Sequence, residues 1–559
     1  MENHKRYEVD LDGLHVRTAG GELVHICSPL HRVGYVTDAD GSRPAHLLEI
    51  ETLTDRKRVE LPEAALVRRS ELTIKLIEYG VRLEENIDSV EHIRTYLKSF
   101  PPHPLFKRVA AEGWMHPNGS GGFVFRKTLY DAAGTTRVIR PIGQQKKFQR
   151  RGDINRWRAV SQMLEANPLP LSALCFALAA PILRPLGQSS FCVSFVGGTS
   201  SGKSTLLRLA QSLLTTPGEL ATWSGTANGL IARAVEHNDL PFIVDEIGQA
   251  IPSDLYQLIY DLTSGLEKLR ANPDGGATVS ASVSTVVISA GEISVFDRMS
   301  LARQRSTGGH YARFITLSVE GEQGIVSDLR GSPSSRIYVK NLNSILRETH
   351  GVAWPRYVRY IAGTVAKIKK DYFRLADQIR EGLTDDLPFD ESDNIASRVL
   401  DHFAISTFAG FLAVEAEIVD LSKRAIGRAM HTCFANWLAG YSRTQAQSQS
   451  KIIEEIKAFL RERQDRIVAF VEYENRESRE PLGYRHTSKS GGSLLLIRPS
   501  ALNDLKEKFG PRIFHESLRN SGWLISGPGN RPTAQFKIPG GGGDKFNAYA
   551  LHESILEGT

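Results

Sequence analysis

Cysteine is scarce in this chain of 559 residues. Cys27, Cys175, Cys192 and Cys433 stand alone, and no two of them form a C-x-x-C pair. The sequence therefore indicates neither a disulfide framework nor a zinc-binding pattern, and this cysteine usage is typical of proteins in a reducing cytosol. We expect a cytoplasmic protein.

Long hydrophobic runs are also missing. The most apolar segment, Leu171 to Leu183, is too short to span a bilayer and contains Pro181. The first residues, Met1-Glu-Asn-His-Lys-Arg, are polar and lack the apolar core of a signal peptide. We therefore interpret 171–183 as a buried helix and expect no membrane partner.

Neither sign of charge dominates the composition. The chain has 69 Lys and Arg against 63 Asp and Glu, a net charge of +6, and 41% of its residues are hydrophobic. This composition is that of a folded globular protein, and the small positive excess permits a nucleic-acid partner without requiring one. The length predicts several domains.

One glycine-rich segment has a specific chemical meaning. Gly197, Gly202, Lys203 and Ser204 satisfy the phosphate-loop pattern G-x-x-x-x-G-K-[ST], directly after the strand-forming run 191–196. Glycines let the backbone N–H groups turn toward one anion. Lys203 would meet the β- and γ-phosphates of ATP, and the Ser204 hydroxyl would bind Mg²⁺. The predicted nucleotide-binding residues are Gly197, Gly198, Thr199, Ser200, Ser201, Gly202, Lys203, Ser204 and Thr205.

A pair of carboxylates ends the next hydrophobic strand, Phe242-Ile-Val-Asp-Glu. ATP hydrolysis needs one carboxylate for the shell of the metal ion and a second group to activate the attacking water. We predict Asp245 as the partner of Mg²⁺, together with Ser204, and Glu246 as the water-activating residue. ATP and Mg²⁺ are the cofactors that follow from this pattern.

Three further residues are candidates for completing the site. Ser289 ends the run Thr285-Val-Val-Ile-Ser and fits a polar sensor at a strand tip between the two motifs. Arg313, just before the strand 314–317, fits an arginine that reaches the nucleotide of a neighbouring subunit; Arg303 and Arg305 are alternatives. Arg398, near the start of a helix, fits an arginine that acts on the nucleotide of its own chain, although a helix-face salt bridge explains it equally well.

The order of the predicted elements divides the chain into four parts. Residues 1–145 show short alternating strands with two helices, at 70–79 and 89–99, and predict a β-rich α+β domain. Residues 146–330 alternate helix and strand, as a parallel α/β sheet requires. Residues 331–441 are helical and predict a lid. A polar linker at 442–450 leads to 449–556, where three helices and a strand–turn–strand at 523–538 have the order of a winged helix.

Basic residues in two of these parts are candidate DNA contacts. Lys268 and Arg270 lie on the rising strand of a predicted hairpin with a Pro-Asp-Gly turn. Arg512 and Arg519 lie on the candidate recognition helix, and Arg531 falls in the wing. A winged helix also serves as a protein-binding module, so its partner stays open at this point.

The succession of phosphate loop, acidic strand end, hairpin, sensor strand, arginine and helical lid is similar to that of AAA+ P-loop ATPases with a pore hairpin. Trp223-Ser-Gly-Thr-Ala-Asn-Gly-Leu, Asp245-Glu-Ile-Gly-Gln and Ser289-Ala-Gly-Glu292 resemble the family named domain of unknown function nine-two-seven. So does the upstream Glu112-Gly-Trp-Met-His. The resemblance covers residues 1 to 320 best. It implies a mobile-element ATPase similar to MCM-like cassette chromosome helicases.

The resemblance thus implies a ring-forming DNA helicase, hexameric, that helps replicate a phage, plasmid or genomic island with a primase or polymerase partner. Arg313, in Ala-Arg-Phe, would correspond to the arginine finger of MCM ATPases. Two other classes stay open from the sequence: a nucleic-acid-sensing ATPase switch that unwinds nothing, and an ATPase that remodels protein partners. The predicted hairpin carries Lys268, Leu269 and Arg270 rather than an aromatic residue, which favours nucleic acid over polypeptide in the pore.

Overall fold

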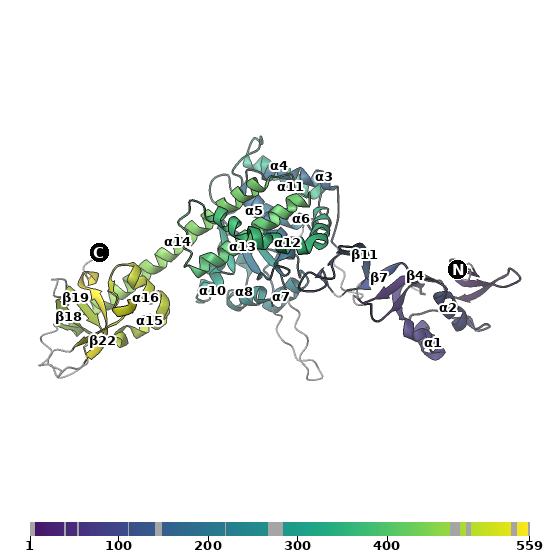
Figure 1. The fold of residues 1–559 in the computed structure, drawn as a ribbon, viewed down its shortest axis with the longest axis horizontal. Coiled ribbons are helices and arrows are strands. Elements are labelled where there is room, and N and C mark those ends of the chain that lie inside the picture. The colour runs from purple at the N-terminus through teal and green to yellow at the C-terminus, as the bar shows by residue number, and fades with distance from the viewer. Residues whose placement is uncertain are drawn as a thin grey trace. The chain divides into compact units, whose positions relative to one another are not determined.

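We describe the fold from a computed structural model (Figure 1). It describes residues 6–38, 41–52, 55–109, 111–139, 148–218, 220–265, 283–469, 481–487, 493–537 and 545–556. The chain forms two compact units, Met1–Trp437 and Leu438–Thr559. The boundaries of the four domains expected from the sequence stay predictions.

The first part of the larger unit is rich in strands, as the sequence predicts. An antiparallel three-stranded sheet has the order β1-β2-β3, and a mixed eight-stranded sheet has the order β6-β5-β4-β7-β11-β10-β9-β8. The two predicted helices are α1 (Arg69–Glu78) and α2 (Ser89–Lys98). The strands are β1 (Tyr7–Val9), β2 (Leu14–Arg17), β3 (Leu23–Cys27), β4 (Leu30–Thr37), β5 (Ala45–Glu51), β6 (Arg56–Pro62), β7 (Leu105–Arg108), β8 (Gly113–Trp114), β9 (Phe123–Phe125), β10 (Thr128–Asp131) and β11 (Gly134–Ile139).

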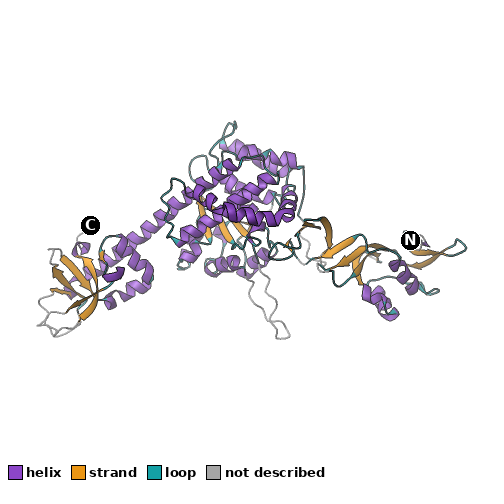
Figure 2. Ribbon diagram, in the orientation of Figure 1, coloured by secondary structure: helices purple, strands orange, loops and turns teal. Residues whose placement is uncertain are grey.

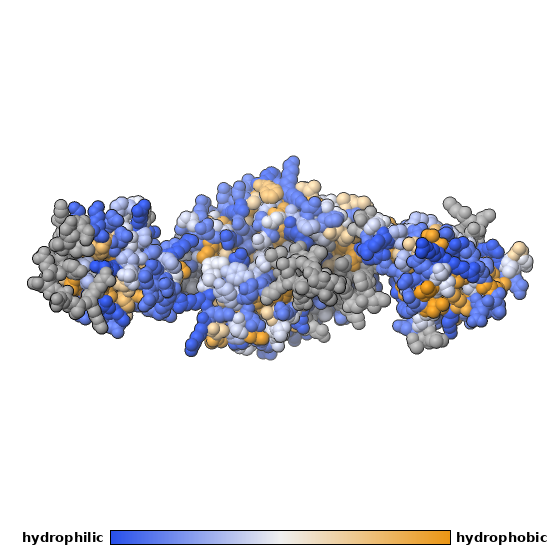
Figure 3. Space-filling model, turned by 90° about the horizontal axis from the view of Figure 1, so that it is seen from below, coloured by the Kyte–Doolittle hydropathy of each residue, from blue (hydrophilic) through white to orange (hydrophobic). Residues whose placement is uncertain are grey.

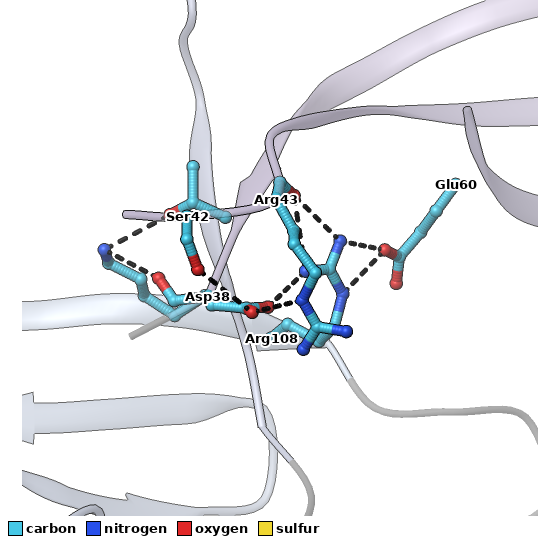
Figure 4. A network of polar contacts seen from close by, with 7 residues as sticks. Asp38, Ser42, Arg43, Glu60 and Arg108 are labelled. Atoms are coloured by element: carbon cyan, nitrogen blue, oxygen red, sulfur yellow. Dashed lines mark hydrogen bonds and ion pairs between the residues drawn. The ribbon is translucent and has the colours of Figure 1, made fainter. Parts of the chain in front are cut away.

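A charged cluster braces the eight-stranded sheet (Figure 4). Arg108, at the end of β7, donates from Nε to Glu60 on β6 at 2.9 Å and forms an ion pair with Asp38, which follows β4. Arg43 pairs with the same aspartate. The Arg43 and Arg108 guanidiniums lower the pKa of Asp38. Because these residues come from both sides of β5, the cluster connects strands that are not neighbours in the sheet.

The helix α1 and the turn before it leave hydrophobic side chains on the surface of this part. Ile74 and Ile77 on α1 are 56% and 60% exposed, and Val67, two residues before the helix, is 75% exposed. Figure 3 shows hydrophobic colour gathered on the N-terminal part, on a surface that is otherwise largely hydrophilic in that view.

The predicted parallel sheet is present, with the strand order β13-β14-β15-β12-β16 and parallel pairing throughout. Its strands are β12 (Phe191–Val196), β13 (Ala221–Thr222), β14 (Phe242–Asp245), β15 (Val286–Gly291) and β16 (Phe314–Ser318). The associated helices are α3 (Ile154–Arg158), α4 (Val160–Leu164), α5 (Pro168–Leu183), α6 (Lys203–Ser212), α7 (Ala227–Val235), α8 (Leu255–Ser264), α9 (Val295–Leu301) and α10 (Gly308–Tyr311). Figure 2 shows these strands surrounded by helices.

The most apolar segment of the chain is a core helix, as predicted. Every residue of α5 from Pro170 to Leu183 is buried, and α5 packs against α13 (Asn394–Glu415). A helix that is apolar on all sides must be enclosed by other elements. Among the helices of the described ranges, none combines the length and the apolarity that a membrane crossing requires.

Residues 331–441, which the sequence predicts to be helical, consist largely of helices. These helices are α11 (Ser335–Glu348), α12 (Ala353–Thr384), α13 and α14 (Lys423–Glu462). The expected polar linker at 442–450 is wrong, because α14 runs through it without interruption. The segment Ser442-Arg-Thr-Gln-Ala-Gln-Ser-Gln-Ser contains neither Gly nor Pro, and its Arg, Gln and Ala residues have good helix propensity.

The smaller unit contains more strands than the sequence predicts. The predicted helices are present as α15 (Asn503–Phe509) and α16 (Pro511–Asn520). The sheet has the order β17-β18-β19-β22-β20, with β21 also paired to β22. Its strands are β17 (Ile467–Ala469), β18 (Gly483–Thr487), β19 (Ser493–Ile497), β20 (Leu524–Ile525), β21 (Ala534–Lys537) and β22 (Lys545–His552).

The predicted strand–turn–strand at 523–538 is wrong in its pairing. The strands β20 and β21 do not pair with each other, because each pairs antiparallel with β22. The pair β18 and β19, which lies between α14 and α15 in the chain, was not predicted either. This unit therefore contains the helices expected of a winged helix within a larger sheet.

A joint connects the strand-rich part to the parallel sheet within the larger unit. The backbone N–H of Trp114, on β8, donates to Asp239 Oδ2 at 2.9 Å, and its indole N–H donates to the carbonyl of Pro181 at 2.6 Å. Asp239 is fully buried and forms an ion pair with Arg184 at 3.1 Å. Its own N–H donates to Ser284 O, so the amino-terminal ends of β14 and β15 are tied to β8.

Candidate nucleotide-hydrolysis site

The predicted phosphate loop connects β12 to α6, as its sequence requires. Gly202 has a φ of +94° and immediately precedes Lys203, the first residue of α6. The Lys203 ammonium donates to the carbonyls of Gly197 and Gly198, at 2.7 and 2.6 Å. The lysine thus lies across the loop, and the N-terminus of α6 faces the same space, where its N–H groups favour an anion.

The two predicted metal-binding groups are in contact. The Ser204 hydroxyl, on the first turn of α6, donates to Asp245 Oδ2 at 3.1 Å. Asp245 is the last residue of β14, and β15 lies between β14 and β12. A hydroxyl and a carboxylate are the hard oxygen ligands that Mg²⁺ prefers, and Mg²⁺ at such sites completes its shell with phosphate oxygens and water. The side chains present therefore fit a Mg²⁺ ion bound together with a nucleotide.

No cage of protein ligands competes with this interpretation within the described ranges, where no group of three or more His, Cys, Asp and Glu side chains is arranged to hold a metal ion. Mg²⁺ seldom needs such a cage, because it usually takes one or two carboxylates and the phosphates of its substrate.

Glu246 follows Asp245 at the carboxyl end of β14. Its backbone is left-handed, with φ +61° and ψ +64°, and its N–H donates to Asp245 Oδ1 at 2.9 Å. A residue other than glycine in this region is uncommon, and such strain is frequent at functional sites. The side chain is exposed, so it is available to a water molecule beside the loop.

Ser289 does not lie at a strand tip. The strand β15 continues past it to Gly291, and Ser289 is aligned with Ser194 and Val244 inside the sheet. Its hydroxyl is buried and accepts a hydrogen bond from the indole N–H of Trp223 at 2.8 Å. The expectation that this hydroxyl faces the nucleotide from the end of a strand is thus not met.

Glu292 takes the position expected for Ser289. It follows the last residue of β15, is exposed, and accepts a hydrogen bond from the Thr199 hydroxyl of the phosphate loop. The sequence holds a signal for it, because Ser289-Ala-Gly-Glu292 contains a charged residue after the apolar run. The predicted strand ends at Ser289, the first polar residue of this segment, whereas β15 continues to Gly291.

A segment after β16 supports the phosphate loop from the side, which the sequence did not predict. The N–H of Val319 donates to Val196 O at 2.7 Å, and the N–H of Ile325 donates to Ser201 O at 3.0 Å. A Cβ on Gly324 would lie 2.2 Å from Ser201 O, so only glycine fits there. We call residues 319–325 the strap.

Arg313 lies at the amino ends of the parallel strands, opposite the ends that carry the phosphate loop. It immediately precedes β16, and its carbonyl accepts a hydrogen bond from Cys192 N at 2.8 Å, near the amino end of β12. Because β12 and β16 are parallel, the phosphate loop lies at their other ends. Arg303 and Arg305, the alternatives, are exposed.

Arg398 lies near Arg313 rather than near the phosphate loop of its own chain. It is exposed on α13, one turn before His402, whose ring contacts Ala312 O at 3.2 Å. Burial lowers the pKa of His402 to about 4, and the positive charges of Arg313 and Arg398 act in the same direction. The expected action on the nucleotide of its own chain is therefore not supported by its place.

The residues predicted to contact DNA lie in three different places. Lys268 and Arg270 lie outside the described residues, as does the predicted hairpin. Arg512 and Arg519 are on α16, where Arg512 Nε donates to Glu516 at 2.7 Å. Arg531 is exposed and precedes β21. The structure tests none of these roles.

Comparisons with known proteins agree with the family resemblance. Residues 8–282 match the family described as "Domain of unknown function (DUF927)". No curated protein matches the chain. A solved structure described as "SCCmec type IV Cch - active helicase" is similar over 99% of this chain and 99% of its own, with a TM-score of 0.61 and 16% sequence identity. At this identity the likeness concerns the fold.

A second solved structure, "The A form apo structure of NrS-1 C terminal region-CTR", covers 63% of this chain and 74% of its own, at 11% identity and a TM-score of 0.23. That likeness supports no statement about the fold. The family match comprises the strand-rich part, the phosphate loop and the acidic end of β14. Through residues 8–282 the chain belongs to the DUF927 family.

Proposed function

We propose that the protein is an ATP-dependent DNA helicase or translocase that works as a ring in the replication of a mobile element such as a phage, plasmid or genomic island. One observation carries the ATPase part of this proposal: Lys203 spans the loop after β12 while Ser204 contacts Asp245 on β14, with β15 between the two strands. A strand between the two motifs is what the AAA+ interpretation requires.

Each side chain then has a defined task. Lys203 and the N–H groups of the loop bind the β- and γ-phosphates, and Ser204 and Asp245 hold Mg²⁺, which neutralises charge on the phosphates. Glu246 orients the attacking water and accepts its proton. Glu292, from the end of β15, is a better candidate than Ser289 for the polar group that faces this water.

The place of Arg313 supports an oligomer. The strand β12 has six residues, so its two ends are about 20 Å apart, farther than an arginine side chain extends. If Arg313 acts on a nucleotide, the nucleotide belongs to a neighbouring subunit. Contacts of this head-to-tail type close into rings when the rotation permits. A hexamer is the ring size that the family resemblance implies, and Arg398 would face the same neighbour.

DNA is the proposed substrate of the ring. The smaller unit would contact DNA or a protein partner through α16, and Lys268 and Arg270 would contact a threaded strand. A primase or polymerase would be supplied by another protein. The fold likeness to a chain described as an active helicase supports this choice over a switch or a protein remodeller.

Two assays test the proposal. ATP hydrolysis with Mg²⁺ is measured alone and with single-stranded DNA, duplex DNA or an unfolded protein, and we expect the largest stimulation by single-stranded DNA. Displacement of a labelled strand from a forked duplex then separates a motor from a switch. Stimulation by protein alone, or hydrolysis without strand displacement, would reject the helicase proposal, and Mg²⁺ removal should abolish turnover.

A further inference from the structure

The Arg313 side chain is held by two different elements. Its guanidinium carbon lies 5.0 Å from the centre of the Tyr260 ring, on α8, and its Nη1 donates to Gly309 O, on α10, at 3.0 Å. Stacking on an aromatic face and a hydrogen bond in the guanidinium plane restrict different motions of the group. The arginine is therefore oriented before any ligand binds.

Gly309 leaves just enough room for this arrangement. A Cβ at this position would lie 2.4 Å from the Tyr260 hydroxyl and 3.3 Å from Arg313 Nη1. The first distance is far below a van der Waals contact, so a larger residue must push the tyrosine away from its place. The close approach of α8 and α10 thus depends on a glycine beside the arginine.

Tyr260 is itself held in place. Its hydroxyl makes a hydrogen bond of 3.1 Å with the Thr307 hydroxyl, and its ring packs edge-on against His310, with ring centres 4.7 Å apart. His310 is buried, accepts the N–H of Thr307 at Nδ1 and contacts Tyr256 O through Nε2. This pattern requires a neutral ring with its proton on Nε2. Burial lowers the pKa of His310, in agreement with a neutral ring.

The rest of the guanidinium stays available. A guanidinium has five N–H donors, and within the described ranges the Gly309 carbonyl is the one acceptor that we find for them. Arg313 is partly exposed. A planar, charged group with free donors and a fixed orientation fits an external phosphate.

We propose that Tyr260 and Gly309 are positioning residues that hold Arg313 in the orientation in which it reaches the nucleotide of a neighbouring subunit. This inference rests on the proposed function, because it assigns a role to Arg313 across a subunit interface. Losing the support should lower turnover through disorder of Arg313 while leaving nucleotide binding by the same chain unchanged.

The test compares Tyr260→Leu, Tyr260→Phe and Gly309→Ala with Arg313→Ala in the full-length protein. We expect Tyr260→Leu and Gly309→Ala to lower kcat about 10- to 100-fold with little change in KM for ATP. Tyr260→Phe, which keeps the stacking ring, should stay within about 3-fold of the parent. Gln257→Leu is the control on α8, because Gln257 is exposed and its amide donates to Asp261 on the same helix. Oligomeric state and thermal midpoint are measured for every variant.

Mixed oligomers separate a positioning role from damage to the fold. In a mixture of Tyr260→Leu and Glu246→Gln subunits, some interfaces combine an intact Arg313 support from one subunit with an intact Glu246 from the other. Random assembly at equal amounts makes such interfaces about a quarter of all interfaces, so activity should recover above that of either variant alone. No recovery would overturn the positioning role.

The two failures can be told apart. If Arg313→Ala hydrolyses ATP at the parental rate, the proposed action of Arg313 across an interface is wrong. If Arg313→Ala is inactive but Tyr260→Leu and Gly309→Ala turn over like the parent, only the support by Tyr260 and Gly309 is wrong.

Discussion

The strap at 319–325 provides a sharp test of how the phosphate loop is held in place. Gly324 has a φ of +60°, and a Cβ there would lie 2.2 Å from Ser201 O and 2.9 Å from Ser201 C, both backbone atoms of the loop. Gly321 has a φ of +91°, and a Cβ there would meet nothing within 4 Å. Alanine at either position carries the backbone cost of a positive φ, about 1–2 kcal/mol. Only Gly324→Ala adds a collision with the phosphate loop.

The size of the effect follows from the distances. An ordinary contact to a Cβ lies at 3.4–4 Å, so a Cβ 2.2 Å from Ser201 O requires the loop and the strap to separate by about 1 Å. The collision is with backbone, which cannot rotate away as a side chain does. A displacement of about 1 Å in a site that orients phosphates costs on the order of 100-fold in turnover. We therefore expect Gly324→Ala to lower kcat/KM for ATP about 100-fold and Gly321→Ala to lower it about 2-fold at most.

The assay is ATP hydrolysis with Mg²⁺, together with binding of a fluorescent ATP analogue and a thermal midpoint for each variant. Since both variants carry the same kind of backbone cost, their difference reports the collision with Ser201. Equal activity of Gly324→Ala and the parent would refute the reasoning that the strap sets the position of the loop.

Three further predictions concern the carboxylates, the sensor strand and a buried histidine. Glu246→Gln should retain binding of the ATP analogue and lower hydrolysis at least about 100-fold, because the amide cannot accept the proton of the attacking water; normal turnover would remove Glu246 from its role. Glu292→Gln should lower kcat, whereas Ser289→Ala should chiefly lower the thermal midpoint, because the buried indole N–H of Trp223 loses its acceptor at a cost of about 1–3 kcal/mol; the reverse pattern would restore Ser289 as the sensor. The pKa of His402 is lowered from 6.5 to about 4 by burial, so the stability that its neutral ring contributes is present above pH 6.5 and is lost as the pH falls through about 4. The free energy of unfolding should therefore fall by about 3 kcal/mol as the pH is lowered through this range. The His402→Gln variant, denatured over the same pH range, should lack this fall. Arg398→Ala should raise the pKa of His402, which is measured by NMR.

Local sequence rules predicted most elements of the larger unit. The strand 191–196 has the predicted bounds, and Thr226 caps α7 by accepting the N–H of Gly229. Such features depend on neighbours in the chain, namely hydrophobic alternation, capping side chains and glycine-rich turns. The shared role of Ser204 and Asp245 at Mg²⁺ was predictable for a similar reason, because the phosphate loop and the acidic strand end are both short local patterns.

The errors arose where pairing between distant segments decides the outcome. The strands β20 and β21 look like a hairpin, but both pair with β22, whose sequence Lys545-Phe-Asn-Ala-Tyr-Ala-Leu-His was not interpreted as a strand. Strand propensity depends on the neighbours that a strand packs against, so a short segment does not reveal its partner. Helix propensity in 442–450 is a local property, and it was underestimated because polar residues were interpreted as a linker.

The sequence alone determined that this chain has a phosphate loop, an acidic strand end and a set of arginines in a fixed order, because each is a short local pattern. The tertiary structure decided which of these groups share a place. The carboxyl ends of parallel strands bring Lys203, Ser204 and Asp245 together, and the amino ends place Arg313 with Tyr260 and with Arg398. The direction of a strand in its sheet depends on pairing across the whole unit, and no local pattern in the chain contains that information.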